Sequence, residues 1–327
     1  MALDGESRPR LVALRALGLG DLLVAVPALR ALARAFPGHR RLLAAPAWLE
    51  PLLPLLADDL GPYLDGLVDL PGLRSDPELL SERPDIAVNL HGRGPESHRL
   101  LLASRPRQLI AHRHDAVEES AWMPAWDPNE HEAKRWCRLL AEIGIEADPA
   151  ELEIERPEID LARWARGATL LHPGAASAAR RWPPERWSAV ARAEVAAGRE
   201  VLVTGSRKEV GLARAIAAAA GLEPRRELAG RTDLYSLAAL VAAADAVVCG
   251  DTGVAHLATA LGVPSVLLFG PTSPRLWGPP EGRGIHRALW EGRVGDPHGD
   301  SVDPGLLEVE VDAVLSALRS VRLVAAW

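Results

Sequence analysis

DAVVCGDTGVAHLATALGVPSVLLF, residues 245–269, decides the fold class of this chain. It contains two apolar runs, and an alanine-rich segment lies between them. The first run stops at a glycine turn, 250–253, and the alanine-rich segment ends at Gly262-Val-Pro264, which is typical of a helix C-terminus. Strand, turn, helix and strand in this order predict one βαβ step of a parallel sheet.

The turn inside this step is a candidate ligand site. Ligands of open parallel sheets bind beyond the carboxyl ends of the strands, where residues 251–253 fall. The backbone N–H groups of Thr252, Gly253 and Val254 would be the unpaired donors of a helix N-terminus, which suits an anion. His256 lies one turn further, on the side that faces this edge. Asp251 and Thr252 fit a plain helix cap equally well, and the local pattern leaves both interpretations open.

Composition limits the class of protein. The chain has 327 residues, 48% of them hydrophobic and 25% charged, which indicates a globular protein of two domains. Its net charge of -7 argues against nucleic acid as the main partner. Cys137 and Cys249 form no disulfide or metal pattern, so a reducing cytoplasm is expected. We expect no signal peptide, no transmembrane segment and at most peripheral membrane contact.

Two series of alternating strands and helices are predicted, with an acidic, proline-containing linker at 147–161 between them. The first series has strands at 10–15, 41–45, 66–70, 85–90 and 107–112, and helices at 22–36, 48–56 and 130–143. The second has strands at 168–171, 200–204, 245–249 and 265–269, helices at 184–197, 209–220, 253–261 and 304–324, and a loop after Pro279. We therefore expect an α/β fold of two Rossmann-like domains, 1–155 and 156–327, whose parallel sheets face each other across a cleft. The last helix is free to pack back on the N-terminal domain.

Gly18-Leu-Gly20-Asp21 follows the first predicted strand and only partly fits a dinucleotide fingerprint. Leu23 occupies the position of the third glycine, and no acidic ribose ligand follows about 20 residues later, so a nicotinamide dehydrogenase is disfavoured. Asp21 stands at a helix start beside the expected cleft. It could act as a general base or serve only as a cap, and spacing does not decide between the two roles.

Two further loops follow strands of the second series. Arg180 and Arg181, in the loop 172–182, could grip a diphosphate through forked donors, or form a solvated charge pair. Glu209, at the end of the loop 204–209, could accept hydrogen bonds from ribose hydroxyls or merely favour the helix dipole. Because both loops should meet the 250–256 turn at one sheet edge, their convergence predicts a ligand site more strongly than any one of them.

Four motifs resemble those of the ADP-heptose-dependent heptosyltransferases, glycosyltransferase family 9. They are RALGLGDLLVAVPALRAL at 15–32, HPGAASAARRWP at 172–183, VTGSRKE at 203–209 and CGDTGVAHLATALGVP at 249–264. The resemblance implies a GT-B fold, with the acceptor on the N-terminal domain and the donor on the C-terminal one. It also implies an inverting reaction that uses no metal or other cofactor.

The resemblance assigns roles to residues at matching positions. It implies that Asp21 is the general base and that Arg180, where the family usually has lysine, supports the leaving group. The donor-binding residues that it implies are Gly20, Ser177, Arg181, Gly205, Glu209, Asp251, Thr252, Gly253 and His256. The donor would be a nucleotide-diphosphate sugar, with ADP-heptose the first candidate.

The acceptor side is less defined. Asn89, His91, Arg93 and Arg113 are polar candidates in the region 85–131. The positive charges of Arg93 and Arg113 fit either an anionic acceptor or a solvated surface, and a glycan, a lipid-linked sugar and a small metabolite all stay open. We expect a monomer. A nucleotide-sugar hydrolase or epimerase of the same fold, and a silent sugar-nucleotide binding protein, are the alternatives, and the presence of Asp21 argues against the second.

Overall fold

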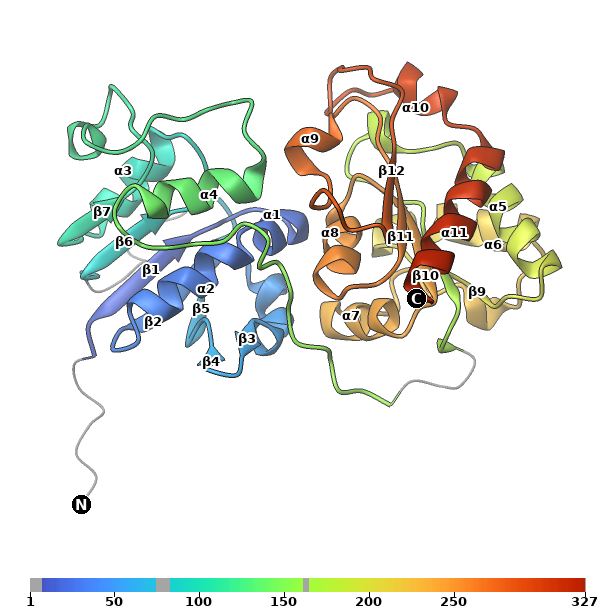
Figure 1. Cartoon of the computed structure of the whole chain (residues 1–327), viewed down its shortest axis with the longest axis horizontal. Coiled ribbons are helices and arrows are strands. Elements are labelled where there is room, and N and C mark those ends of the chain that lie inside the picture. The colour runs from blue at the N-terminus through green and yellow to red at the C-terminus, as the bar shows by residue number, and fades with distance from the viewer. Residues whose placement is uncertain (1–7, 75–82, 161–164, 327) are drawn as a thin grey trace. The chain divides into compact units, whose positions relative to one another are not determined.

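The computed structural model describes residues 8–74, 83–160 and 165–326, arranged in two compact units, Met1–Glu155 and Arg156–Trp327 (Figure 1). The first seven residues, and Leu161 at the end of the predicted linker, lie outside the described residues. Each unit has one parallel sheet of five strands with helices packed on it, which confirms the α/β class.

The sheet of unit 1 has the strand order β5-β2-β1-β6-β7, and all its pairs are parallel. Its strands are β1 (Arg10–Leu14), β2 (Arg40–Ala45), β5 (Gly66–Asp69), β6 (Ile86–Asn89) and β7 (Gln108–Ile110). A small antiparallel pair, β3 (Ala57–Asp58) and β4 (Gly61–Pro62), stands apart from it. Strand order reverses between β1 and β6, so their carboxyl ends form the switch point at which ligands of such sheets bind.

The helices of unit 1 differ in part from the sequence prediction. They are α1 (Leu19–Val24), α2 (Val26–Ala35), the 3-10 helix η1 (Ala47–Leu55), α3 (Glu96–Ala103), η3 (Glu118–Ser120) and α4 (Glu132–Ala141). The single helix predicted over 22–36 is two helices, since α1 ends at Ala25 and Pro27 lacks the N–H that would continue it. Helix α3, which the sequence did not predict, packs on β6.

The sheet of unit 2 has the order β12-β11-β10-β8-β9 and is also fully parallel. Its strands are β8 (Thr169–His172), β9 (Val201–Val203), β10 (Ala246–Gly250), β11 (Ser265–Leu268) and β12 (His286–Leu289). The sequence predicted a loop after Pro279, and β12 corrects this, because its half-exposed edge position gave it no continuous apolar run. Here the switch point lies between β8 and β10.

The helices of unit 2 cover both faces of its sheet, with α5, α6 and α11 on one face and α7 and α8 on the other (Figure 1). They are η5 (Ala178–Arg180), α5 (Pro184–Ala196), η6 (Arg207–Glu209), α6 (Val210–Ala219), η7 (Pro224–Arg226), α7 (Leu234–Ala242), α8 (Gly253–Ala260), α9 (Pro274–Trp277), α10 (Pro304–Glu308) and α11 (Val311–Ala325). The predicted last helix is therefore broken between α10 and α11. Its buried side, with Val314, Leu318 and Val321, belongs to the core of unit 2, whereas the sequence left it free to pack on the N-terminal domain.

A buried carboxylate ties three elements of unit 2 together. Glu194 of α5 accepts hydrogen bonds from Thr169 Oγ1 (2.6 Å), Arg199 Nε (2.8 Å) and Arg322 Nη2 (2.7 Å), which come from β8, the turn after α5 and α11. Burial alone would raise the pKa of Glu194, but the bonds from these three side chains lower it from 4.5 to about 2. The ionised carboxylate therefore stabilises unit 2, which carries the three loops of the predicted ligand site.

We expect Glu194→Gln to destabilise unit 2. Because the folded pKa lies below the unfolded one, the carboxylate stabilises the fold above pH 4.5, and this contribution is lost as the pH falls toward 2. The lost stabilisation at neutral pH is about 3 kcal/mol by linkage. Urea unfolding at several pH values checks this, with Glu185→Gln, an exposed carboxylate on the same helix, as the control. Equal unfolding free energies for the two variants at pH 7 would contradict it.

Candidate functional site

Asp21 lies at the carboxyl end of β1, in the first turn of α1. Its Oδ2 accepts the N–H of Gly18 at 3.1 Å, and its Oδ1 lies 3.5 Å from Arg15 Nη2. The side chain is 28% exposed. Asp21 thus caps α1 through the N–H of Gly18 and still presents a carboxylate to solvent, so capping is shown and the role of general base stays a prediction.

His91 stands at the neighbouring strand end, because β6 pairs directly with β1 and its last residue aligns with the last residue of β1. Burial and, to a lesser extent, the charge of Arg15 lower the pKa of His91 from 6.5 to about 4, and the charge of Asp21 opposes this shift only in part. The imidazole is therefore neutral at neutral pH. Its Nδ1 is buried and has no hydrogen-bond partner within the described part of the chain. A neutral ring next to Asp21 could bond to a substrate hydroxyl.

Of the other predicted acceptor residues, Asn89 supports a turn, whereas Arg93 and Arg113 carry exposed charges. Asn89 is fully buried. Its Nδ2 donates to Gly92 O (3.2 Å) and Ser97 Oγ (2.8 Å) and lies 3.0 Å from His98 Nδ1, so its amide shapes the turn that carries His91. Arg93 and Arg113 are exposed and follow β6 and β7, which are adjacent strands. Both guanidinium groups thus lie beyond the carboxyl edge of the same sheet as Asp21.

In unit 2, Arg180 joins the loop after β8 to the turn after β10. Its Nη1 donates to Asp251 O at 3.0 Å and lies 3.9 Å from Asp251 Oδ2. A Cβ on Gly250 would lie 3.2 Å from Arg180 O, so the glycine permits this close approach. Arg180 is 21% exposed, which leaves the guanidinium accessible to a ligand.

Ser177 and Arg181, which were also predicted to bind the donor, support the loop around Arg180. Ser177 Oγ accepts the N–H of Ala179 at 3.1 Å and donates to Gly299 O at 3.3 Å, which fixes η5. Arg181 Nε donates to Ala175 O at 2.9 Å, while the rest of its side chain is exposed. Both residues therefore hold the backbone that presents Arg180.

The N-terminus of α8 lies beside Arg180. Thr252 is the N-cap, but its side chain makes no capping hydrogen bond, so the interpretation of Thr252 as a side-chain cap is wrong. The N–H groups of Gly253 and Val254 find no acceptor among residues 8–74, 83–160 and 165–326. His256 follows on the same helix and packs edge-on against Trp277, with ring centroids 6.0 Å apart. An accessible cation beside free backbone donors is the arrangement that binds a diphosphate.

Glu209 belongs to the third loop. Its Oε2 accepts the N–H of Ser206 at 2.7 Å, and a Cβ on Gly174 would lie 2.1 Å from its Cδ. The lack of a side chain at Gly174 therefore lets the carboxylate lie against the loop after β8. Gly205 also lies close, since a Cβ there would be 3.2 Å from that of Glu209. His172 links the same two loops through its Nδ1, 3.0 Å from Thr204 Oγ1.

The structure thus brings together the three loops whose convergence the sequence predicted. The sequence missed the residues that support each unit's candidate residues. In unit 1 these are Arg15, Glu132 and Trp136 around Asp21, and in unit 2 it is Gly299, whose carbonyl accepts the N–H of Ala179 at 3.1 Å. Arg15 gave a signal, an arginine directly after an apolar strand. The described residues include no group of three His, Cys, Asp or Glu side chains that could hold a metal ion.

No helix among the described residues is long and apolar enough to cross a membrane.

Residues 118–289, more than half of the chain, match the family model of glycosyltransferase family 9 (heptosyltransferase). The lipopolysaccharide heptosyltransferase 2 of Escherichia coli K12 is 38% identical over 99 residues, which are 29% of this chain and 28% of that protein. The match thus spans less than a third of that curated relative.

Two solved structures are similar over nearly the whole chain. The E. coli ADP-heptose lipopolysaccharide heptosyltransferase II has a TM-score of 0.74 at 21% identity, covering 97% of this chain and 100% of that one. An E. coli heptosyltransferase solved with ADP has a TM-score of 0.69 at 18% identity, covering 95% and 99%. These likenesses confirm the expected GT-B fold.

Proposed function

Because the chain belongs to glycosyltransferase family 9, we propose that it is an inverting enzyme that transfers a heptose from ADP-heptose to an acceptor hydroxyl. The observation that carries this proposal is the convergence of Arg180, the N-terminus of α8 and Glu209 at the switch point of unit 2. The reaction as proposed uses no bound metal or other cofactor, since Arg180 and backbone N–H groups take up the charge of the leaving diphosphate.

The donor binds unit 2 under this proposal. The diphosphate lies at the N–H groups of Gly253 and Val254, where the helix dipole favours negative charge. Arg180 donates to its oxygens, and Glu209 accepts from the ribose hydroxyls. The similar E. coli heptosyltransferase that was solved with ADP supports an adenine nucleotide here.

The acceptor binds unit 1 under the same proposal. Its hydroxyl attacks the anomeric carbon of the heptose, the bond from that carbon to the diphosphate oxygen breaks, and Asp21 takes the hydroxyl proton. Attack from the face opposite the leaving group inverts the anomeric centre. Neutral His91 bonds to the acceptor near Asp21. The exposed Arg93 and Arg113 favour an acceptor that carries phosphate or carboxylate groups.

Both cysteines support a reducing, cytoplasmic location for this reaction. Cys137 and Cys249 are free, buried thiols. Burial raises the pKa of Cys137 to about 12 and also raises that of Cys249, so both remain protonated and unreactive at neutral pH. Neither thiol therefore enters the proposed chemistry.

Nucleotide binding tests the donor assignment. We expect ADP to bind more tightly than UDP or GDP in calorimetry, and Glu209→Gln to weaken ADP binding by about 10- to 100-fold, since hydrogen bonds to a charged group are lost. Glu223→Gln, at an exposed carboxylate that pairs with Arg225, is the control. Tighter binding of UDP than of ADP, or an unchanged ADP affinity in Glu209→Gln, would overturn the assignment.

A further inference from the structure

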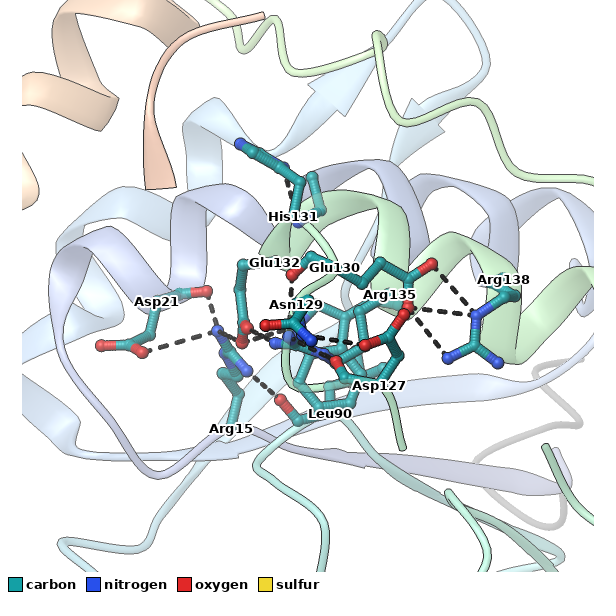
Figure 2. A network of polar contacts seen from close by, with 12 residues as sticks. Arg15, Asp21, Leu90, Asp127, Asn129, Glu130, His131, Glu132, Arg135 and Arg138 are labelled. Atoms are coloured by element: carbon teal, nitrogen blue, oxygen red, sulfur yellow. Dashed lines mark hydrogen bonds and ion pairs between the residues drawn. The ribbon is translucent and has the colours of Figure 1, made fainter. Parts of the chain in front are cut away.

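A buried network of charged side chains lies beside Asp21, and the proposed reaction gives these side chains no role (Figure 2). We infer that Glu132 is a positioning residue for the general base. Its charge partly compensates that of Arg15, so Arg15 orients Asp21 without strongly stabilising the ionised carboxylate. The inference rests on the proposed role of Asp21.

Arg15 is held rigidly at the end of β1. Its side chain is 0% exposed, and its Nε donates to Asp21 O at 2.9 Å. Its Nη1 donates to Leu90 O, the first residue after β6, and its guanidinium lies 5.0 Å from the ring centroid of Trp136. These contacts leave little freedom to the group, so the position of its charge relative to Asp21 is set by the fold.

Two carboxylates share Nη2 of Arg15, and they share it unequally. The distance is 3.0 Å to Glu132 Oε1 and 3.5 Å to Asp21 Oδ1. Glu132 is only 5% exposed and also accepts Trp136 Nε1 at 3.1 Å and Arg135 Nη1. The shorter contact, in the less polar surroundings, is the stronger one. Glu132, which Arg135 also contacts, therefore compensates part of the charge of Arg15, and Asp21 receives a weaker, orienting contact.

The charge on Asp21 depends on this compensation. The groups that face it are Arg15 after β1, His91 after β6 and, through Arg15, Glu132 of α4. His91 is neutral, so Arg15 is the cation that acts on the carboxylate. If Glu132 lost its charge, the whole charge of Arg15 would stabilise ionised Asp21, and a more strongly stabilised carboxylate is a weaker base.

The chain supplies a matched control two residues away. Glu130 pairs with Arg138, with Oε1 3.0 Å from Nε and Oε2 2.9 Å from Nη2, and Figure 2 shows this pair apart from Arg15. Glu130→Gln and Glu132→Gln thus remove the same charge near the start of the same helix. Only the second one changes what Arg15 faces.

The test follows the carboxyl carbon of Asp21 by NMR in protein labelled with ¹³C-aspartate, with the signal assigned by its absence in Asp21→Asn. We expect Glu132→Gln to move the titration midpoint of this signal about one pH unit lower than in the unsubstituted protein, and Glu130→Gln to leave it in place. This readout needs no acceptor, and a purely structural role of Glu132 would not move it.

A second variant covers the case in which the buried arginines destabilise Glu132→Gln. Glu132→Gln with Arg135→Gln removes one charge of each sign and leaves Arg15 facing Asp21 alone, so the same downward shift is expected. An unshifted midpoint in both variants would overturn the role of Glu132. The proposed transferase would survive that result, because its base is tested separately by the activity of Asp21→Asn.

Discussion

Replacing Asp21 with Asn is expected to lower kcat by about 100- to 10,000-fold, the usual loss when a general base is removed. The amide keeps the size of the side chain, and its oxygen can still accept the N–H of Gly18, so α1 should keep its cap. ADP affinity should stay unchanged, because the residues proposed to bind the nucleotide belong to unit 2. Steady-state release of ADP from ADP-heptose and calorimetry with ADP measure the two quantities.

The control for this variant is Asp59→Asn, at an exposed aspartate between β3 and β4. It should retain the kcat of the unsubstituted protein. Near-normal turnover by Asp21→Asn would remove Asp21 from the mechanism. An equal loss of kcat and of ADP affinity would instead point to misfolding.

Removing the guanidinium of Arg180 should have the second largest effect. We expect Arg180→Ala to lower kcat by about 100- to 1,000-fold, comparable to the loss of one preorganised donor to a developing negative charge. Arg180→Lys should recover part of the loss, because it restores the charge without the forked geometry that reaches Asp251 O. Single-turnover kinetics with ADP-heptose separate this effect from weaker binding.

Arg192→Ala is the matched control, since Arg192 on α5 is exposed and donates only to Ala219 O among the contacts of the described residues. It should leave kcat unchanged. If Arg180→Ala turned over at a rate close to that of Arg192→Ala, the leaving diphosphate would have to be stabilised by the N-terminus of α8 without Arg180.

The sequence was sufficient to predict that three loops meet at one edge of the sheet of unit 2. Parallel strands place their carboxyl ends at one edge, so loops that follow neighbouring strands must meet there. The pairing of β8 with β9 and with β10 fulfils this condition and brings Glu209, Arg180 and Asp251 together. This part of the prediction depended on the parallel direction of the strands, which the alternation of strands and helices indicates; the order of the strands in the sheet was not predicted.

The environment of Asp21 was beyond such patterns. Arg15 and Glu132 are 117 positions apart and meet only because α4 packs in unit 1. Asn89 shows the same limit. A polar residue at a strand end is a natural ligand candidate, yet the amide of Asn89 already forms hydrogen bonds within the turn that carries His91. Local spacing identifies which residues reach the sheet edge, but only tertiary packing decides which of them remain available to a substrate.

Mass spectrometry of the products formed from ADP-heptose tests the proposed transfer of heptose most directly. The assay combines the enzyme with ADP-heptose and a panel of phosphorylated and neutral sugars, and includes an arm without acceptor. We expect a phosphorylated acceptor to gain one heptose, with ADP released rapidly only in the presence of that acceptor. Rapid ADP release in the acceptor-free arm, with no heptosylated product in any other arm, would contradict a transferase and indicate a nucleotide-sugar hydrolase.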